Sequence, residues 1–292
     1  MKAVFIGMGR MGAGMAARIV TAGLPLGVYN RDSSKCEPLW TLGARVYNDL
    51  PDALNGADVV FTMLSDDAAL SAVMTDEGIA SMAPGSVHVS MSTISVELSS
   101  RLADRHAGAG AGYVGCPVFG RPDAAASGTL NLCVSGVAAD KKKVMPYLET
   151  MGKVWDFGAT PSGAHAVKLA GNFMFGSILE MLGEAFSLVE NSGIEPEKFY
   201  DLITGSFLSA PTIKTYGRLI LDGEFDQAGF AARLGAKDIG LVRGAAKASN
   251  TPMPMASLVE DRLLRILARG WGEKDWSVIG YTQREDAGLI KK

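Results

Sequence analysis

Short apolar runs alternate with helical patterns along the first 160 residues of the chain. The runs favour strands at residues 3–7, 26–30, 58–64, 86–91, 112–116 and 130–136. Between them, apolar residues recur at helical spacing, at residues 11–22, 35–42, 51–55, 67–74, 96–106 and 141–151. This order predicts an α/β fold with a doubly wound, mainly parallel sheet covered on both faces. A binding crevice is expected at the carboxyl ends of its strands.

The pattern changes after residue 160, where helical spacing continues and no further strand is indicated. A helix at residues 163–191 would be roughly 45 Å long, enough to join two domains. Further helices are expected at residues 197–204, 211–221, 230–249 and 255–268. The sequence therefore predicts an α/β domain at residues 1–162 and an all-helical domain at residues 163–292.

Composition and charge narrow the range of partners. Of 292 residues, 20% are charged and 48% hydrophobic, which is typical of a globular protein with a sizeable core. The net charge is −3, and the only basic run, Lys141, Lys142 and Lys143, is interpreted as a solvated helix start, so no nucleic-acid partner is expected. No signal peptide or membrane-spanning run is seen, and we expect a complete cytoplasmic chain. The three cysteines are widely spaced, so no metal site is expected.

A glycine-rich turn follows the first expected strand. Its glycines have the G-x-G-x-x-G spacing, which also suits an ordinary tight turn, but here it opens a helix at the start of an αβ domain. The first glycine would permit the turn, the second the approach of a pyrophosphate, and the third close packing of helix on strand. The motif predicts a Rossmann domain that binds a dinucleotide at a helix amino terminus. The residues of the turn are Gly7, Met8, Gly9, Arg10, Met11 and Gly12.

The end of the second expected strand bears on the choice of cofactor. Asn30 stands where an NAD site commonly has a carboxylate for the ribose, whereas Arg31 and Ser33 suit the 2′-phosphate of NADP. Asp32 could turn toward the ribose, and the segment RDSS could also cap the next helix through Ser33 or Ser34. NADP(H) is the preferred prediction, with NAD(H) as the alternative.

A lysine interrupts the apolar start of the long helix. Lys168 stands among apolar neighbours in GAHAVKLAGN, and Asn172 follows one turn later on the same face. On a solvated face the lysine would have no special role, whereas in a cleft it would serve as a proton donor and acceptor that Asn172 orients. The spacing alone leaves both interpretations open.

The three histidines are given structural roles. His88 is expected to be half-buried in a strand, and His106 to lie at a helix carboxyl end, where a positive charge is favoured. His165 precedes Lys168 and could tune it, but a surface position at the edge of a loop is the preferred interpretation.

Motifs in a fixed order extend over essentially the whole chain. They are GMGRMG at 7–12, MSTIS at 91–95, GTL at 128–130, GAHAVKLAGN at 163–172 and KD at 237–238. With them the chain resembles the β-hydroxyacid dehydrogenase family, which includes 3-hydroxyisobutyrate dehydrogenases and glyoxylate/succinic semialdehyde reductases. The resemblance implies an oxidoreductase with a nucleotide domain like that of 6-phosphogluconate dehydrogenase. It also implies a homodimer or homotetramer built through the helical domain, which would take part in substrate binding.

The same resemblance assigns roles to individual residues. Lys168 is implied to be the general acid/base, donating a proton to a substrate carbonyl oxygen as hydride reaches the carbonyl carbon, with Asn172 as its helper. Without the resemblance, the KD pair could be an ordinary pair on a helix surface. The cofactor and substrate contacts implied in addition are Met63, Leu64, Ser92, Thr93, Lys237 and Asp238.

The chain departs from the family pattern at CPVFGRPDAAASGTL, residues 116–130. Where the family usually has a serine and two glycines against the substrate carboxylate, this chain has Phe119, Gly120 and Arg121. Arg121 could hold a carboxylate with two hydrogen bonds or point to solvent, and Phe119 could narrow the pocket or make it more apolar. This segment leaves the exact substrate open.

Three functions are compared. The leading one is NADP-dependent reduction of a small aldehyde or keto acid, or oxidation of the matching β-hydroxyacid, of the 3-hydroxyisobutyrate, succinic semialdehyde or glyoxylate type. An imine reductase-like enzyme is the alternative, although such enzymes generally carry an acid or tyrosine in place of Lys168. A non-catalytic NADP-binding structural or regulatory protein is the third.

Overall fold

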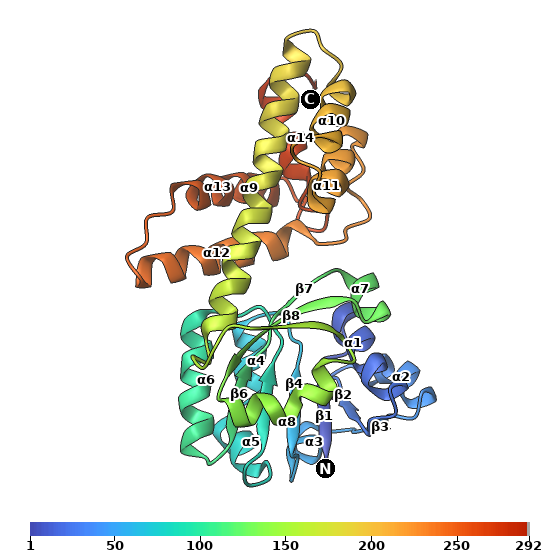
Figure 1. The fold of residues 1–292 in the computed structure, drawn as a ribbon, viewed down its shortest axis with the longest axis vertical. Coiled ribbons are helices and arrows are strands. Elements are labelled where there is room, and N and C mark those ends of the chain that lie inside the picture. Colours follow the sequence, from blue (N-terminus) through green and yellow to red (C-terminus); the bar gives the residue numbers. More distant parts are fainter. Residues whose placement is uncertain (291–292) are drawn as a thin grey trace. The chain divides into compact units, whose positions relative to one another are not determined.

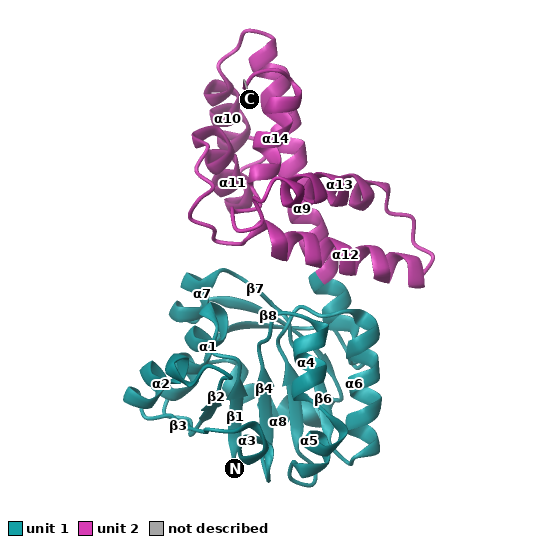
Figure 2. Ribbon diagram, turned by 180° about the vertical axis from the view of Figure 1, so that it is seen from behind, with its two compact units in different colours: residues 1–168 teal, residues 169–292 magenta. Residues whose placement is uncertain are grey.

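The computed structural model describes residues 1–290. It divides into two compact units that meet in sequence between Lys168 and Leu169 (Figure 2). The long helix therefore begins in unit 1 and continues into unit 2. The last two residues of the expected helical domain lie outside the described part.

Unit 1 is built on one sheet with the order β3-β2-β1-β4-β5-β6-β8-β7, and β9 also pairs with β8 (Figure 1). The pairs from β3 to β6 are parallel, whereas β8 runs antiparallel to β6 and β7. The predicted fold class, α/β with a mainly parallel sheet, is confirmed. The strands are β1 Ala3–Ile6, β2 Gly27–Tyr29, β3 Arg45–Val46, β4 Val59–Thr62, β5 Val87–Ser90, β6 Gly112–Gly115, β7 Val118–Phe119, β8 Leu130–Gly136 and β9 Gly152–Asp156.

Both faces of the sheet are covered because side chains alternate along its strands. Phe5 packs into one core with residues of α1, α2, α7 and α8, whereas Ile6 packs into a second core with residues of α3 to α6. The sequence pattern of these strands is almost wholly apolar, as expected for strands buried on both sides. The helices are α1 Arg10–Thr21, α2 Glu37–Thr41 after the 3₁₀ turn η1 Ser33–Cys36, α3 Leu50–Leu54, α4 Asp67–Val73, α5 Asp76–Ser81, α6 Val96–Gly108, α7 Pro122–Ser127 and α8 Ala138–Leu148.

Unit 2 is helical in its described part. An ion-pair network fastens its last helix, because Arg262 of α13 donates to Glu180 of α9 at 2.7 Å and pairs with Asp286 of α14 at 2.5 Å. Within residues 1–290, each helix is too short or too polar to cross a bilayer. The helices are α9 Gly163–Asn191, α10 Pro196–Gly205, α11 Pro211–Asp222, α12 Ala232–Ala248, α13 Pro254–Ala268 and α14 Val278–Asp286.

The prediction that residues 141–143 lie solvated at a helix start is wrong for Lys141. The helix begins earlier, at Ala138, and Lys141 is only 8% exposed. Its ammonium lies 2.6 Å from Asp156 of β9 and donates to the Gly158 carbonyl at 3.1 Å. Lys141 therefore fastens α8 to the edge of the sheet.

The structure also corrects the histidine assignments. His165 is 1% exposed, so the expected surface position is wrong, and His88 is fully buried rather than half-buried. His106 is fully buried as well, and burial lowers its pKa to about 4. At neutral pH it is therefore uncharged and does not act as a cation at the helix end.

Candidate active site

The glycine-rich turn lies at the point where the strand order reverses. β1 has β2 on one side and β4 on the other, so the turn after β1 opens at the switch point of the sheet. Gly7 has a φ of +103°, and a Cβ there would lie 2.3 Å from the Met63 carbonyl oxygen. A Cβ on Gly12 would lie 1.9 Å from the Gly7 carbonyl oxygen. The fold itself therefore requires glycine at both positions.

Gly9 differs from these two glycines. A Cβ built on it has no heavy atom within 4 Å, so this glycine borders open space in front of α1. Gly9 is also the N-cap of α1, with no side-chain capping bond and no acidic residue in the first turn. The first amides of the helix and its partial positive charge thus suit a pyrophosphate. Beside them, Arg10 is exposed and Met11 is half-buried.

The segment after β2 supports the turn and presents a cation. The Asn30 side chain accepts from the Met8 amide at 2.9 Å and donates to the Asp32 carbonyl at 2.9 Å. The Asp32 carboxylate accepts from the Ser34 hydroxyl at 2.6 Å and from its amide at 3.2 Å, and these bonds lower the pKa of Asp32. Asp32, rather than a serine, therefore caps η1. Arg31 and Ser33 are exposed beside it.

The next two strands lead into the loops expected over the nucleotide. Met63 and Leu64 follow β4 and are half-buried. Ser92, after β5, is fully buried, and its hydroxyl accepts from the Leu64 amide at 2.8 Å. Thr93 comes next and is half-buried. Ser92 thus fastens one loop to the other.

Lys168 is half-buried near the start of α9, on the unit 1 side of the division. Its ammonium lies 4.1 Å from the centroid of the Phe119 ring. Burial raises the pKa of the Cys133 thiol on β8, and the charge of Lys168 partly offsets this. The interpretation of Lys168 as a solvated lysine is thereby disfavoured. The contact with Phe119 has no signal in the sequence, because the two residues come from separate elements.

The segment that departs from the family pattern has at its centre a position that favours glycine. Gly120 has a φ of +144°, and a Cβ there would lie 2.5 Å from a methyl group of Leu130. Arg121 follows as the N-cap residue of α7 and is half-buried. The backbone conformation thus fixes the directions in which the neighbouring side chains leave the chain.

A second group of predicted residues meets within unit 2. The Asn172 amide on α9 donates to the Asp238 carboxylate on α12 at 2.5 Å, and both side chains are buried. The Lys237 ammonium lies 3.0 Å from the other carboxylate oxygen. Because Asp238 is 2% exposed, this is not an ordinary pair on a helix surface. The hydrogen bond between Asp238 and Asn172 was not predicted from the sequence, because the two residues stand far apart in the chain.

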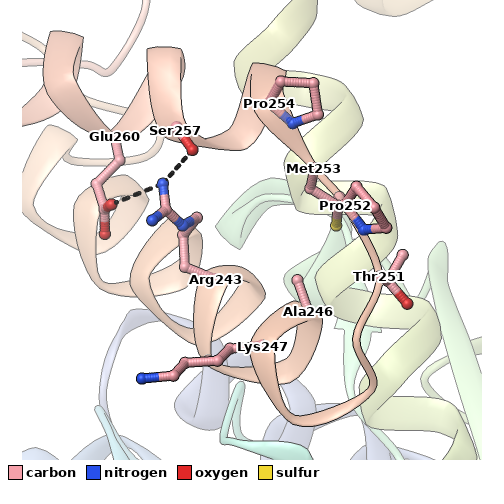
Figure 3. A pocket seen from close by; sticks show the side chains of 10 residues that line it. Arg243, Ala246, Lys247, Thr251, Pro252, Met253, Pro254, Ser257 and Glu260 are labelled. Atoms are coloured by element: carbon pink, nitrogen blue, oxygen red, sulfur yellow. Dashed lines mark hydrogen bonds and ion pairs between the residues drawn. The ribbon is translucent and has the colours of Figure 1, made fainter.

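A cavity of about 600 Å³ lies elsewhere in unit 2, at the turn between α12 and α13 (Figure 3). Arg243 contacts Ser257 and Glu260 across its wall, and Lys247 and Met253 also line it. None of the predicted site residues lines this cavity. Among the described residues, no group of three His, Cys, Asp or Glu side chains could hold a metal ion.

Comparison with known families agrees with this arrangement over nearly the whole chain. Residues 2–167 match the family described as the NAD binding domain of 6-phosphogluconate dehydrogenase. Residues 162–280 match that described as the NAD-binding domain of NADP-dependent 3-hydroxyisobutyrate dehydrogenase. The chain belongs to the β-hydroxyacid dehydrogenase family. The resemblance found in its motifs is confirmed, and the protein is an NAD(P)-dependent dehydrogenase or reductase.

Individual members of the β-hydroxyacid dehydrogenase family are similar over their full length. An NAD-dependent L-serine dehydrogenase of Pseudomonas aeruginosa is 32% identical, with 94% of this chain and 95% of the relative covered. The mitochondrial 3-hydroxyisobutyrate dehydrogenase of Drosophila melanogaster is 30% identical, with 94% and 87% covered. The solved 3-hydroxyisobutyrate dehydrogenase of Mycobacterium tuberculosis with L-serine is 27% identical, with a TM-score of 0.89 and 97% and 99% covered.

Proposed function

We propose that this enzyme interconverts small aldehyde or keto acids and the matching hydroxyacids with NADP(H), and that Lys168 is its general acid/base. The substrates would be of the 3-hydroxyisobutyrate, succinic semialdehyde or glyoxylate type. The observation that carries the proposal is the half-buried Lys168 at the start of α9, whose ammonium lies 4.1 Å from the centroid of the Phe119 ring. A cation kept partly away from water suits proton transfer better than a solvated one.

The side chains around the reaction would have separate tasks. The bound nicotinamide supplies or accepts the hydride. Protonated Lys168 donates to the carbonyl oxygen and so neutralises the charge that develops there, and in oxidation the neutral amine takes the hydroxyl proton. Asn172, one turn further along α9, is assigned as the positioning residue, because its amide is oriented by Asp238.

The loops of unit 1 would hold the cofactor. The open space at Gly9 and the uncapped amides of α1 suit the pyrophosphate, while Met63, Leu64 and Thr93 would line its nicotinamide half. Ser92 would act through Leu64, because its own hydroxyl is buried. Lys237 is assigned to the nicotinamide side by the family pattern.

Preference for NADP(H) over NAD(H) rests on Arg31. Asp32 is the one carboxylate in the segment RDSS that could serve the ribose of NAD, and one of its oxygens, Oδ1, accepts from both the amide and the hydroxyl of Ser34 within η1. Arg31 is exposed next to it, where a 2′-phosphate would find a charged donor.

The experiment is an NADPH-oxidation screen over aldehyde and keto acids of two to five carbons, run in parallel with NADH and with a cyclic imine. Replacing Lys168 with Ala should lower kcat by about 10²–10⁴-fold, the usual contribution of a positioned acid/base. Lys142→Ala, which changes an exposed lysine of α8, should leave it unchanged.

Three outcomes would overturn parts of the proposal. Wild-type turnover by Lys168→Ala would remove the lysine from the mechanism. Equal kcat/KM with NADH and NADPH would reject the cofactor preference. Turnover of the cyclic imine alone would point to the imine reductase alternative.

A further inference from the structure

The backbone of Phe119 is held in place beside Lys168. Phe119 stands opposite Asn131 in the antiparallel β7–β8 pair, and the Cys133 amide donates to the Pro117 carbonyl at 2.9 Å. On its other side, Gly120 has a backbone conformation that favours glycine and packs closely against Leu130. The backbone that carries Phe119 is thus held on both sides, and its ring lies 4.1 Å from the Lys168 ammonium.

The charge distribution of the ring gives this contact two consequences. The face of an aromatic ring is negative, so it attracts the ammonium of Lys168. The same face repels a carboxylate, which would also lose hydration against an apolar wall. A substrate that approaches Lys168 therefore meets a surface that discriminates by charge.

Distance determines which part of the substrate meets the ring. A carbonyl oxygen that accepts from Lys168 lies roughly 2.8 Å from the ammonium. The ammonium itself lies 4.1 Å from the ring centroid, so a substituent of the carbonyl carbon that points toward β7 would reach Phe119. A carboxylate bonded directly to that carbon would lie close to the ring. A carboxylate separated by two methylene groups can lie beyond it, with apolar carbons against the ring.

We propose that Phe119 is a specificity-determining residue that selects carbonyl substrates with an apolar substituent next to the reacting carbon. It disfavours those that carry a carboxylate directly on that carbon. This inference rests on the proposed function, because it takes Lys168 as the group that meets the carbonyl oxygen. It narrows the substrate class to aldehyde acids whose acid group is remote, of the succinic semialdehyde type, over glyoxylate.

The test is the ratio of kcat/KM for succinic semialdehyde to that for glyoxylate, with NADPH, in wild type and three variants. The wild-type ratio should exceed one. Phe119→Leu keeps an apolar side chain but removes the aromatic face, and Phe119→Ser removes both. Each should therefore shift the ratio toward glyoxylate by roughly fivefold or more, the scale on which an aromatic face and a nearby charge interact. Phe119→Tyr keeps the face and should change the ratio less than about twofold.

The ratio isolates the proposed effect. A change in the proton donor alters both substrates alike and cancels, whereas repulsion of the carboxylate alters glyoxylate alone. A ratio in Phe119→Leu equal to that of wild type, or a wild-type preference for glyoxylate, would overturn the inference. Melting temperatures of the variants identify any that fail to fold, and Phe119→Tyr then remains as the conservative comparison.

The two proposals fail in different ways. If Lys168→Ala keeps wild-type turnover with both substrates, Lys168 is not the general acid/base, and the part of the proposed function on which this inference rests is wrong. If Lys168→Ala is inactive and the ratio does not respond to Phe119→Leu, only the role of Phe119 is wrong.

Discussion

The three histidines of the chain meet in the interior of unit 1, although the sequence separates them widely. The rings of His88 and His106 lie 4.8 Å apart, and the Tyr113 hydroxyl is 3.4 Å from His165 Nε2. Tyr113 also pairs with the Ser99 hydroxyl at 3.1 Å. Each histidine has a ring nitrogen without a hydrogen-bond partner in the described structure, which suits ordered water in this polar region.

These buried histidines predict a loss of stability in mild acid. Burial lowers the pKa of His165 to about 3 and that of His106 to about 4, against an ordinary value of 6.5. Below pH 6.5 the unfolded chain therefore binds protons that the folded chain does not, and stability falls until the folded pKa values are reached. At pH 5, His106 and His165 should each lower the unfolding free energy by about 2 kcal/mol.

Urea unfolding at pH 7.5 and pH 5 measures this effect. Above about pH 7.5 both histidines are neutral in the folded and in the unfolded chain, so their contribution should be constant from there upward. His106→Gln removes one titrating group and should weaken the pH dependence. Equal unfolding free energies at the two pH values would show that the histidines do not titrate as their burial requires.

At the scale of elements, the sequence pattern predicted the longer strands and helices and missed several very short ones. The long strands and helices of unit 1 were visible because their apolar spacing runs over several residues. β3 and β7 have two residues each, and β9 lies at an edge with Lys153 and Trp155 exposed, so none shows a buried pattern. α7 had a usable signal, since Pro122 begins it and Gly128 ends it with a positive φ.

Substitutions at two glycines of the β1–α1 connection should distinguish an effect on folding from an effect on cofactor binding. Gly9→Ala places a methyl group in open space at an ordinary backbone conformation, so the apo melting temperature should stay within about 1–2 °C of wild type. The KM for NADPH should rise by roughly tenfold or more, because the methyl group would occupy the approach of the pyrophosphate.

Gly12→Ala is the matched comparison in the same turn. Its methyl group would clash with the Gly7 carbonyl, so the apo protein should melt several degrees lower even without cofactor. Thermal unfolding of both variants, with and without NADPH, measures the difference. If Gly9→Ala bound NADPH as well as wild type, the dinucleotide would not approach along this backbone.

For the whole molecule, strand order brings together the candidate cofactor residues that the sequence motifs and the family resemblance assigned. Residues that follow β1, β2, β4 and β5 come to one edge of the sheet, because the carboxyl ends of parallel strands lie together. The contacts of Lys168 with Phe119 and of Asn172 with Asp238 could not be predicted in this way. They depend on how separate elements pack, which the spacing of residues within one element does not predict.

The surface of α9 bears on how whole molecules associate. Met174, Met181 and Leu188 recur every seven residues along this helix and are 61%, 42% and 70% exposed. A helix that is apolar on both its buried and its exposed sides is typical of one covered by another chain. We propose that two copies, or four in a pair of dimers, bury this stripe of three residues.

Light scattering after size-exclusion chromatography should therefore give a dimer or tetramer for the wild type. Met181→Glu combined with Leu188→Glu places charges in the proposed contact, where burying an unpaired carboxylate is costly, so the mass should fall toward that of one chain. Lys142→Glu alters exposed charge on unit 1 and should leave the mass unchanged. A monomeric wild type, or a double variant that keeps the wild-type mass, would mean that the apolar stripe of α9 is not where the copies meet.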